Sequence, residues 1–347
     1  NPETVTLTDE ARDKYIDDTF KVFGLRGKGH LSPRLGISHP VTDNDMLYLH
    51  YGHFSQKPKG HYVYAKLNST SEATYQLFGN PNLDPTTTVA YEIGLKHRFN
   101  ANQTIEIKAY YKDMFDYPTS MSIRKFSPRY GNISYLMYVN MDYARSRGVE
   151  IRFRRRYSKY LSGNVDFTYA KATGKSSTPN TNLLVQAGKV AEKSIRESSL
   201  SWDRPFRVSA DVFFDMPKGA NVNLFGFKIP ELWSLTFRWD LESGKRYHRL
   251  VDVENNIYEK DEYGGISESW WRMDIRFRKD IQVGGMGFAF FIEAENILNT
   301  KVPRIINPVT GRPYEPGDVI PITWYDDPRD LPADNPARYE WPRRVLT

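Results

Sequence analysis

The sequence predicts an all-β protein whose strands form an antiparallel transmembrane β-barrel. Three features predict it: apolar and charged residues alternate, short and long connections alternate, and no apolar run reaches the roughly 18 residues of a transmembrane helix. The hairpin from Asp142 to Tyr169 shows the first feature, since Val149, Ile151 and Phe153 alternate with charged residues. Alternate side chains of a strand point to opposite faces, so one face is apolar and the other is charged.

The composition narrows the class of protein. Aromatic residues make up 14% of the 347 residues, and the net charge is only +6, with both signs interleaved along the chain. This pattern does not predict a nucleic-acid surface. The chain has no cysteine, which excludes disulfides, thiolate nucleophiles and cysteine zinc sites. No signal peptide is visible after Asn1, as expected for a mature exported protein or a fragment.

Ten segments have the alternation of a strand. They are residues 31–40, 46–55, 89–100, 104–117, 148–156, 161–170, 206–214, 233–241, 271–278 and 286–294. The fifth strand can begin as early as Met137. Residues 1–30 are polar and predict an exposed irregular loop. Residues 340–347 resume the alternation, so they predict the start of an eleventh strand.

The connections between these segments alternate in length. Short turns lie at residues 41–45, 101–103, 157–160 and 283–285, the last with glycines available for positive φ. Long connections of roughly 20 to 40 residues occupy 56–88, 118–136, 171–201, 243–267 and 300–339. Outer-membrane barrels have short periplasmic turns and long extracellular loops, whereas compact soluble domains seldom contain so many long loops.

Two alternatives remain open at this point. One is a soluble β protein that buries the aromatic face in a core and exposes the charged face. The other is a self-contained small outer-membrane barrel that acts as an enzyme or an adhesin. No Ser/His/Asp arrangement can be assembled from the sequence, so no catalytic residue is predicted and the protein is not expected to be an enzyme.

The charged faces of the strands supply the candidate interior residues. We expect them to form ion pairs with a plug or to line a polar lumen. They are Glu92, Lys96, Glu150, Arg152, Arg154, Arg272, Asp274 and Arg276. A second set of aromatic side chains is expected at a membrane-interface girdle, where amphipathic rings are favoured. It comprises Trp202, Trp270, Trp271, Tyr110 and Tyr111.

Three groups of residues could in principle hold a metal. They are the acidic loop residues Asp252, Glu254, Glu259, Asp261 and Glu262, the later group Asp326, Asp327, Asp330 and Asp334, and the histidines His39, His50, His53 and His61. Neither acidic group has the spacing of a calcium loop, so we interpret both as solvated charge and the histidines as scattered barrel residues. No metal, cofactor or substrate-binding residue is predicted.

Four motifs in order resemble one known family. They are LSPRLGISHPV with YLHYGHF at 31–54, GNPNL with AYEIG at 79–94, ARSRGVE at 144–150 and EAENILNT at 293–300. They resemble the barrel of TonB-dependent outer-membrane receptors, most closely the Bacteroidetes type with an N-terminal carboxypeptidase-regulatory-like domain. The resemblance covers about residues 31–347.

This resemblance implies a cell outer-membrane receptor that binds a scarce ligand at extracellular loops and imports it into the periplasm. Such a barrel has about 22 strands, so the ten to eleven strands in residues 31–347 correspond to its C-terminal part, after a loop at 1–30. The implied partners are outer-membrane lipid, the plug domain and N-terminal half of the barrel, which this sequence lacks, and the TonB complex. We therefore expect a piece of a larger receptor. The resemblance does not specify whether the ligand is a siderophore, cobalamin, an oligosaccharide or a peptide.

Overall fold

A computed structural model gives the structure of the chain. It describes residues 13, 15–64, 77–127, 131–177, 179, 197–253, 255, 257–315, 318 and 339–340. Almost all the regular structure in these residues is strand. No helix within the described ranges is long and apolar enough to cross a membrane.

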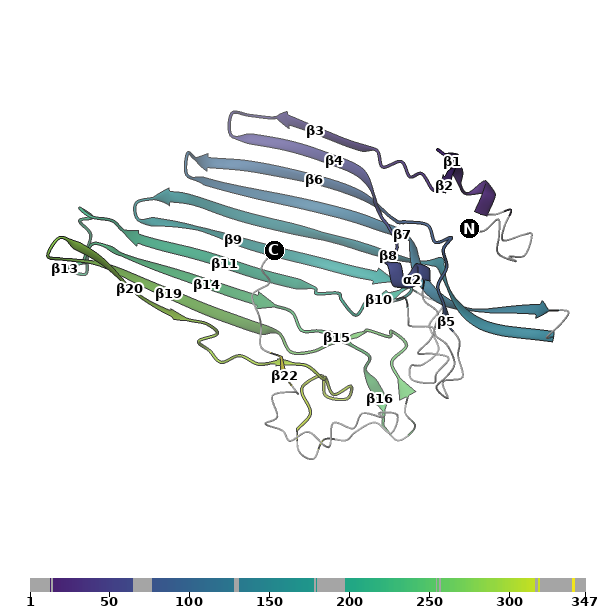
Figure 1. The fold of residues 1–347 in the computed structure, drawn as a ribbon. Helices are drawn as coiled ribbons and strands as arrows, with labels where there is room; N and C mark the ends of the chain where they lie inside the picture. The colour runs from purple at the N-terminus through teal and green to yellow at the C-terminus, as the bar shows by residue number, and fades with distance from the viewer. Residues whose placement is uncertain are drawn as a thin grey trace.

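The main feature of the fold is one antiparallel sheet, in which ten strands follow one another in chain order (Figure 1). These strands are β3 (Arg34–Pro40), β4 (Asp45–Gln56), β6 (Thr86–Asn100), β7 (Gln103–Ser127), β8 (Gly131–Ser158), β9 (Leu161–Gly174), β11 (Phe206–Met216), β14 (Trp233–Glu242), β19 (Trp270–Val283) and β20 (Met286–Ala294). The ten predicted strands are therefore confirmed. The sheet runs from β3 to β20 without joining these two strands within the described residues, as in a section of a barrel wall.

Short elements surround the ends of these strands. They are β1 (Phe20–Val22), β2 (Leu25–Gly27), α2 (Gly60–Tyr64), β5 (Leu77–Phe78), β10 (Ser198–Ser199), β12 (Asn223–Leu224), β13 (Phe227–Lys228), β15 (Arg246–Tyr247), β16 (Leu250–Asp252), β17 (Ile257–Tyr258), β18 (Gly265–Ile266), β21 (Val302–Pro303) and β22 (Tyr339–Glu340). β5 extends the sheet parallel to β8, and β10 pairs with β9. β22 pairs with β21 and not with β20, so residues 339–340 do not begin an eleventh barrel strand. Residues 341–347 lie outside the described residues.

The two ends of the sheet differ in how the chain reverses. At the left-hand end in Figure 1 the strands are joined mainly by tight turns, which we call the turn end. Gly284 and Gly285 have φ of 57° and 82° there, as predicted for the β19–β20 turn. Lys159 and Tyr160 adopt φ of 49° and 69° in the β8–β9 turn, a conformation that side chains disfavour. The long connections lie at the other end, the loop end.

One predicted long loop is wrong. Residues 118–136 extend the β7–β8 hairpin, with Ser127 paired to Gly131 at its tip. The register shifts at Met114–Tyr117 and again before Pro118, which interrupts the alternation that the prediction followed. β-bulges bend a strand and displace its side chains by one position, so the extension no longer has the pattern of the strand below it.

Loops at the loop end pack into two small apolar clusters. Leu77, Leu83, Leu136 and Tyr138 form the first, with Tyr62 of α2 against it. The second joins Leu200 to Ala144, in the middle of β8, and to Ala172, near the loop end of β9. Because both clusters join loop residues to β8 or β9, the loop end is a built structure and not a set of free connections.

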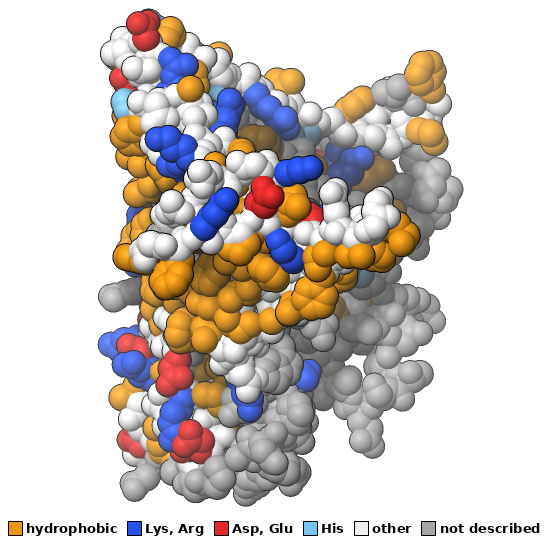
Figure 2. Space-filling model, turned by 90° about the vertical axis from the view of Figure 1, so that its left-hand side faces the viewer, with side chains coloured by type: hydrophobic (Ala, Val, Ile, Leu, Met, Phe, Trp, Pro, Cys, Tyr) orange, Lys and Arg blue, Asp and Glu red, His pale blue; other side chains and the backbone are white. Residues whose placement is uncertain are grey.

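The two faces of the sheet have opposite chemistry. One register row crosses eight strands with apolar side chains alone: Leu47, Leu95, Ile107, Ile151, Phe167, Val208, Leu241 and Trp271. We call this the apolar face. Many of its members are exposed, including Leu95 and Trp271 at 42% and 47%. Figure 2 looks onto the turn end and shows hydrophobic side chains gathered in a broad exposed band, with Lys and Arg side chains gathered beside it.

Candidate functional site: the charged face and the loop cluster

The opposite side of the sheet, which we call the charged face, carries rows of alternating sign. One row lies a single residue from the apolar row and crosses β6 to β19. Its members are Lys96, Glu106, Arg152, Asp166, Ser209, Asp240 and Arg272. Opposite charges directly across two strands stabilise a sheet by about 0.2–1 kcal/mol for each pair. The row therefore helps to fix the register of the sheet.

Among the described residues, ion pairs join four of the nine neighbouring strand pairs across the charged face, namely β6–β7, β7–β8, β8–β9 and β11–β14. On β7 and β8, Lys108 Nζ lies 3.0 Å from Glu150 Oε2. On β11 and β14, Arg238 Nε donates to Asp211 Oδ1 at 2.6 Å, and Arg152 pairs with Asp166 between β8 and β9. These side chains are 23–43% exposed, so water screens the pairs and each contributes little to stability.

A buried arginine fixes the last strand of the sheet. Arg272 is 5% exposed, and its Nε donates to Asp274 Oδ1 at 2.8 Å. Its Nη2 donates to Glu295 Oε2, also at 2.8 Å, and Asp274 Oδ1 accepts from the Asn296 backbone N–H. The network attaches the loop end of β20 to β19.

A glycine allows a hydrogen bond that spans three strands. The Tyr48 hydroxyl on β4 donates to Glu106 Oε1 on β7 at 2.6 Å. Its ring crosses β6 above Gly94, where an added Cβ would stand only 2.2 Å from Tyr48 Cζ. Any side chain at position 94 would therefore displace the tyrosine ring and break the bond.

The structure places five of the eight predicted interior residues in cross-strand or same-strand ion pairs. These are Glu92, Glu150, Arg152, Arg272 and Asp274. Lys96 and Arg154 form no ion pair with any described residue, and Arg276 lies over the Phe291 ring at 5.7 Å. The role of these residues towards a plug stays a prediction.

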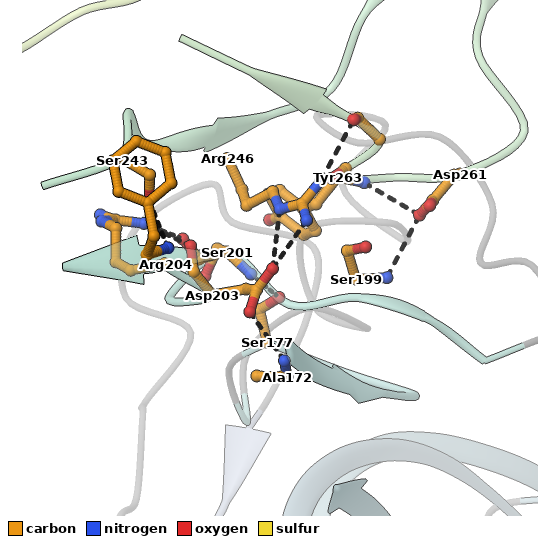
Figure 3. Close-up of polar contacts among 12 residues, drawn as sticks. Ala172, Ser177, Ser199, Ser201, Asp203, Arg204, Ser243, Arg246, Asp261 and Tyr263 are labelled. Carbon is orange, nitrogen blue, oxygen red and sulfur yellow. Dashed lines mark hydrogen bonds and ion pairs between the residues drawn. The ribbon is translucent and has the colours of Figure 1, made fainter. Parts of the chain in front are cut away.

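A buried ion pair joins the loops at the loop end (Figure 3). Asp203 is 1% exposed, and its Oδ2 accepts from Arg246 Nε at 2.9 Å and from Nη2 at 2.8 Å. Its Oδ1 accepts from the Ala172 N–H on β9 at 2.7 Å. Arg246 Nη1 also donates to the backbone oxygens of Tyr263 and Gly264, at 3.4 and 3.2 Å. One carboxylate thus connects a strand end, the 200–205 loop and β15, and we call this group the Asp203 cluster.

Further side-chain caps surround the Asp203 cluster, as Figure 3 shows. Asp261 Oδ1 accepts from the backbone N–H groups of Ser199 and Tyr263, at 3.3 and 3.4 Å. Ser177 Oγ accepts from the Ser201 N–H at 2.9 Å. Each cap satisfies a loop N–H group that would otherwise be costly to remove from water.

Partial burial shifts the acid–base properties of two cations beside this cluster. Desolvation lowers the pKa of the Arg204 guanidinium, although Glu242 and Asp203 oppose the shift. Desolvation also lowers the pKa of the Lys245 amine, and the positive charge of Arg204 adds to the effect. Burial raises the pKa of the Tyr263 phenol. Arg204 Nε pairs with Glu242 Oε1 at 3.4 Å, and Lys245 Nζ donates to the Pro303 carbonyl oxygen at 3.3 Å, so both cations beside the cluster have partners within the chain.

The described residues contain no group of three or more His, Asp or Glu side chains placed to hold a metal. Asp261 is a backbone cap, and Asp252 Oδ1 accepts from the Asn255 N–H at 3.1 Å. His50 lies against Tyr48, and His53 Nε2 lies 2.5 Å from the Tyr51 hydroxyl. Glu254 and the group Asp326, Asp327, Asp330 and Asp334 lie outside the described residues.

The prediction of an aromatic girdle is wrong for Tyr110. Its ring lies on the charged face, above Gly148 and 4.9 Å from Lys112 Nζ. Tyr111, the next residue, lies on the apolar face in the same row as Tyr91. Adjacent residues of a strand cannot both face lipid, which is the physical reason for the error.

The Asp203–Arg246 pair and the Tyr48–Glu106 bond were missed by sequence analysis. The paired residues are 43 and 58 positions apart, and no local pattern marks long-range partners in loops. Tyr48 lies in the MLYLHYGHFS segment, whose two faces separate poorly in the sequence. A glycine in the otherwise regular alternation of residues 89–100 was the available signal, because a strand glycine often marks a close approach by another group.

The sheet is open and antiparallel, with one apolar and one charged face, and it has a turn end and a loop end. These features are those of a section of the wall of an outer-membrane-type barrel. The family described as TonB dependent receptor-like, beta-barrel, matches residues 4–297, so the chain belongs to this family. No match is found among curated proteins.

Solved structures show the same fold. The outer membrane transporter YddB from Escherichia coli superposes with a TM-score of 0.56 at 14% identity, over 78% of this chain and 37% of that chain. The ferripyoverdine receptor of the outer membrane of Pseudomonas aeruginosa, bound to ferripyoverdine, gives 0.50 at 13% identity, over 81% and 31%. The chain thus spans about a third of the length of these structures.

Proposed function

We propose that the chain is the C-terminal barrel section, residues 31–347, of a receptor in the cell outer membrane. The receptor binds a scarce ligand at the loop end and imports it into the periplasm by energised movement of a plug domain. One observation carries the proposal: the loop end is built from packed loops with a buried ion pair, above a wall that is apolar on one face and charged on the other.

The proposal assigns each surface a partner. The apolar face contacts membrane lipid, because its exposed side chains would be costly to hold in water. The charged face borders the barrel interior and the plug, and the remaining strands of a barrel of about 22 pair with the edges β3 and β20. Energy comes from the TonB complex. We further propose the Bacteroidetes type with a carboxypeptidase-regulatory-like domain, on the strength of the four motifs in residues 31–300.

Similarity to the ferripyoverdine receptor supports a chelated or otherwise scarce nutrient as the ligand. The protein is proposed as a binding and transport protein, without bond chemistry.

Cell fractionation, gel migration and ligand uptake of the full-length receptor, measured in the bacterium that produces it, test this proposal. We expect the receptor in the outer-membrane fraction, with gel migration that changes on heating. Uptake of one member of a panel of ferric siderophores, cobalamin, oligosaccharides and peptides should fall when the gene is deleted or when an uncoupler collapses the proton gradient. A protein found in the soluble fraction, or uptake that is insensitive to the uncoupler, would contradict the proposal.

A further inference from the structure

Two cations lie directly opposite one another on the apolar face. Arg147 of β8 is paired in register with Lys171 of β9, and both side chains are exposed. Like charges in directly opposed strand positions destabilise a sheet. Neither side chain forms an ion pair with any described residue, so the part of the chain that the structure describes supplies no counter-ion for them.

The neighbouring acids are already engaged. One row closer to the loop end, Arg145 Nε donates to Asp113 Oδ1 at 3.0 Å and Nη1 donates to Glu197 Oε2 at 3.1 Å. Thr173 also donates to Glu197. Asp113 and Glu197 are thus used by Arg145, and no described residue compensates the charge of Arg147 and Lys171.

The residues around the two cations have the composition expected where a protein surface crosses the boundary between lipid head groups and hydrocarbon. In the same register row, Tyr51, Tyr91 and Tyr111 cross β4, β6 and β7 and lead directly to Arg147. The next row towards the turn end is uncharged: Leu49, Ile93, Ala109, Val149 and Tyr169. Tyrosine rings favour the boundary between hydrocarbon and head groups, and cations beside them reach lipid head groups.

An apolar depression adjoins the tyrosine row. It has a volume of about 440 Å³, and its lining includes Leu35, Ile37, Leu49 and Ile93 together with the three tyrosines. Small-molecule pockets have volumes of roughly 300–1,000 Å³. The depression therefore has room for part of an acyl chain, and Arg147 follows one strand beyond Tyr111.

We propose that Arg147 and Lys171 bind the phosphate group of a membrane lipid whose acyl chains lie in this depression. A phosphate monoester carries a charge of about −1.5 to −2, which balances both cations, whereas a carboxylate balances only one. Arginine binds phosphate with two parallel hydrogen bonds, and lysine adds a point charge. The inference rests on the proposed function in one respect, since it requires this face to contact a bilayer.

Native mass spectrometry of the full-length receptor in detergent tests the site. The probes are phosphatidic acid, phosphatidylcholine with the same acyl chains, and inorganic phosphate. We expect the receptor to retain phosphatidic acid, and the R147Q/K171Q variant to retain about tenfold less, the scale of losing charge-assisted hydrogen bonds. Inorganic phosphate at an equal concentration should not displace the lipid, and phosphatidylcholine should be retained weakly.

The matched control removes two exposed cations from the turn end, in an R156Q/K218Q variant with the same change in net charge. It should retain phosphatidic acid like the unchanged receptor. Heat-dependent gel migration verifies folding, and the single variants R147Q and K171Q replace the double variant if that one does not fold.

Equal retention by R147Q/K171Q, equal retention of phosphatidylcholine, or displacement by inorganic phosphate would each overturn the inference. Fractionation and uptake are measured separately. A receptor that resides in the outer membrane and imports its ligand, yet retains no phosphatidic acid, contradicts the lipid site alone.

Discussion

The apolar row through Ile107 and the charged row through Glu106 differ by one residue in every strand, yet they place opposite demands on the molecule. The apolar row contains no charged group that needs a partner, and Leu95, Ile107 and Trp271 in it are exposed. Most charges of the charged row are paired within the chain, through Arg152–Asp166, Arg207–Asp240 and Arg272–Asp274, and Lys96 is a row member without an ion pair to any described residue. The apolar face therefore depends on its surroundings, whereas many side chains of the charged face are paired with residues of neighbouring strands.

The largest expected effect comes from Asp203→Asn, which leaves the Arg246 guanidinium buried without its counter-charge. Loss of one partner of a buried ion pair destabilises by about 3–5 kcal/mol. We expect the loops at 197–205 and 243–266 to lose protection first, as amide hydrogen exchange would measure. The control, Asp211→Asn, breaks a half-exposed pair on the charged face and should cost at most about 1 kcal/mol. Equal effects of the two substitutions would show that burial does not distinguish the loop cluster from the wall.

The next effect tests the two rows directly. Ile107→Arg places a charge in the middle of the apolar face, where the cost for outer-membrane barrels is about 2–4 kcal/mol. Ser209→Arg places the same side chain in the charged row, between Asp166 and Asp240, and should change the unfolding free energy by less than about 1 kcal/mol. Denaturant titration of the receptor in lipid vesicles measures both. Similar costs at the two positions would remove the basis for assigning the faces.

A smaller loss of unfolding free energy is expected from substituting Gly94, which leaves room for the Tyr48 ring on the charged face. Gly94→Ala should displace the Tyr48 ring from Glu106 and cost about 1.5–3 kcal/mol, the range for a hydrogen bond to a charged group. In a receptor that already carries Tyr48→Ala, much of this cost should disappear, because both the ring that the added Cβ would meet and the hydrogen bond are gone. Gly287→Ala is the control, since an added Cβ there meets no atom within 4 Å. A full cost in the Tyr48→Ala background would contradict the role given to Gly94.

The smallest effect is one of pH. Burial lowers the pKa of Lys245 below its ordinary 10.5, so the unfolded chain binds more protons between the two values. The contribution of Lys245 to stability therefore rises with pH across that window and falls as pH drops through it. Amine acylation followed by mass spectrometry should give half-labelling of Lys245 at a lower pH than for free lysine. Half-labelling at or above the pH of free lysine would contradict the burial of this amine.

The strands of the main sheet were predictable because each of them repeats the same local pattern, the alternation of apolar and polar residues. All ten strands followed from alternation, and Gly284–Gly285 followed from the need for positive φ. The extension at 118–136 was not predictable in this way, because register shifts beside Pro118 interrupt the alternation. The Asp203 cluster depends on residues from separate loops, and only the folded chain brings them together. The lipid, plug and ligand roles remain proposals.

Single cysteines on β7 give the most direct test of the two faces, since the chain contains no cysteine of its own. Spin labels at positions 105 to 110 of the full-length receptor in lipid vesicles can be compared for collisions with oxygen and with a water-soluble nickel chelate. We expect oxygen to dominate at positions 105, 107 and 109 and the chelate at 106, 108 and 110. Access that does not alternate, or a chelate that reaches 105, 107 and 109 freely, would contradict a wall with one face in lipid and the other in water.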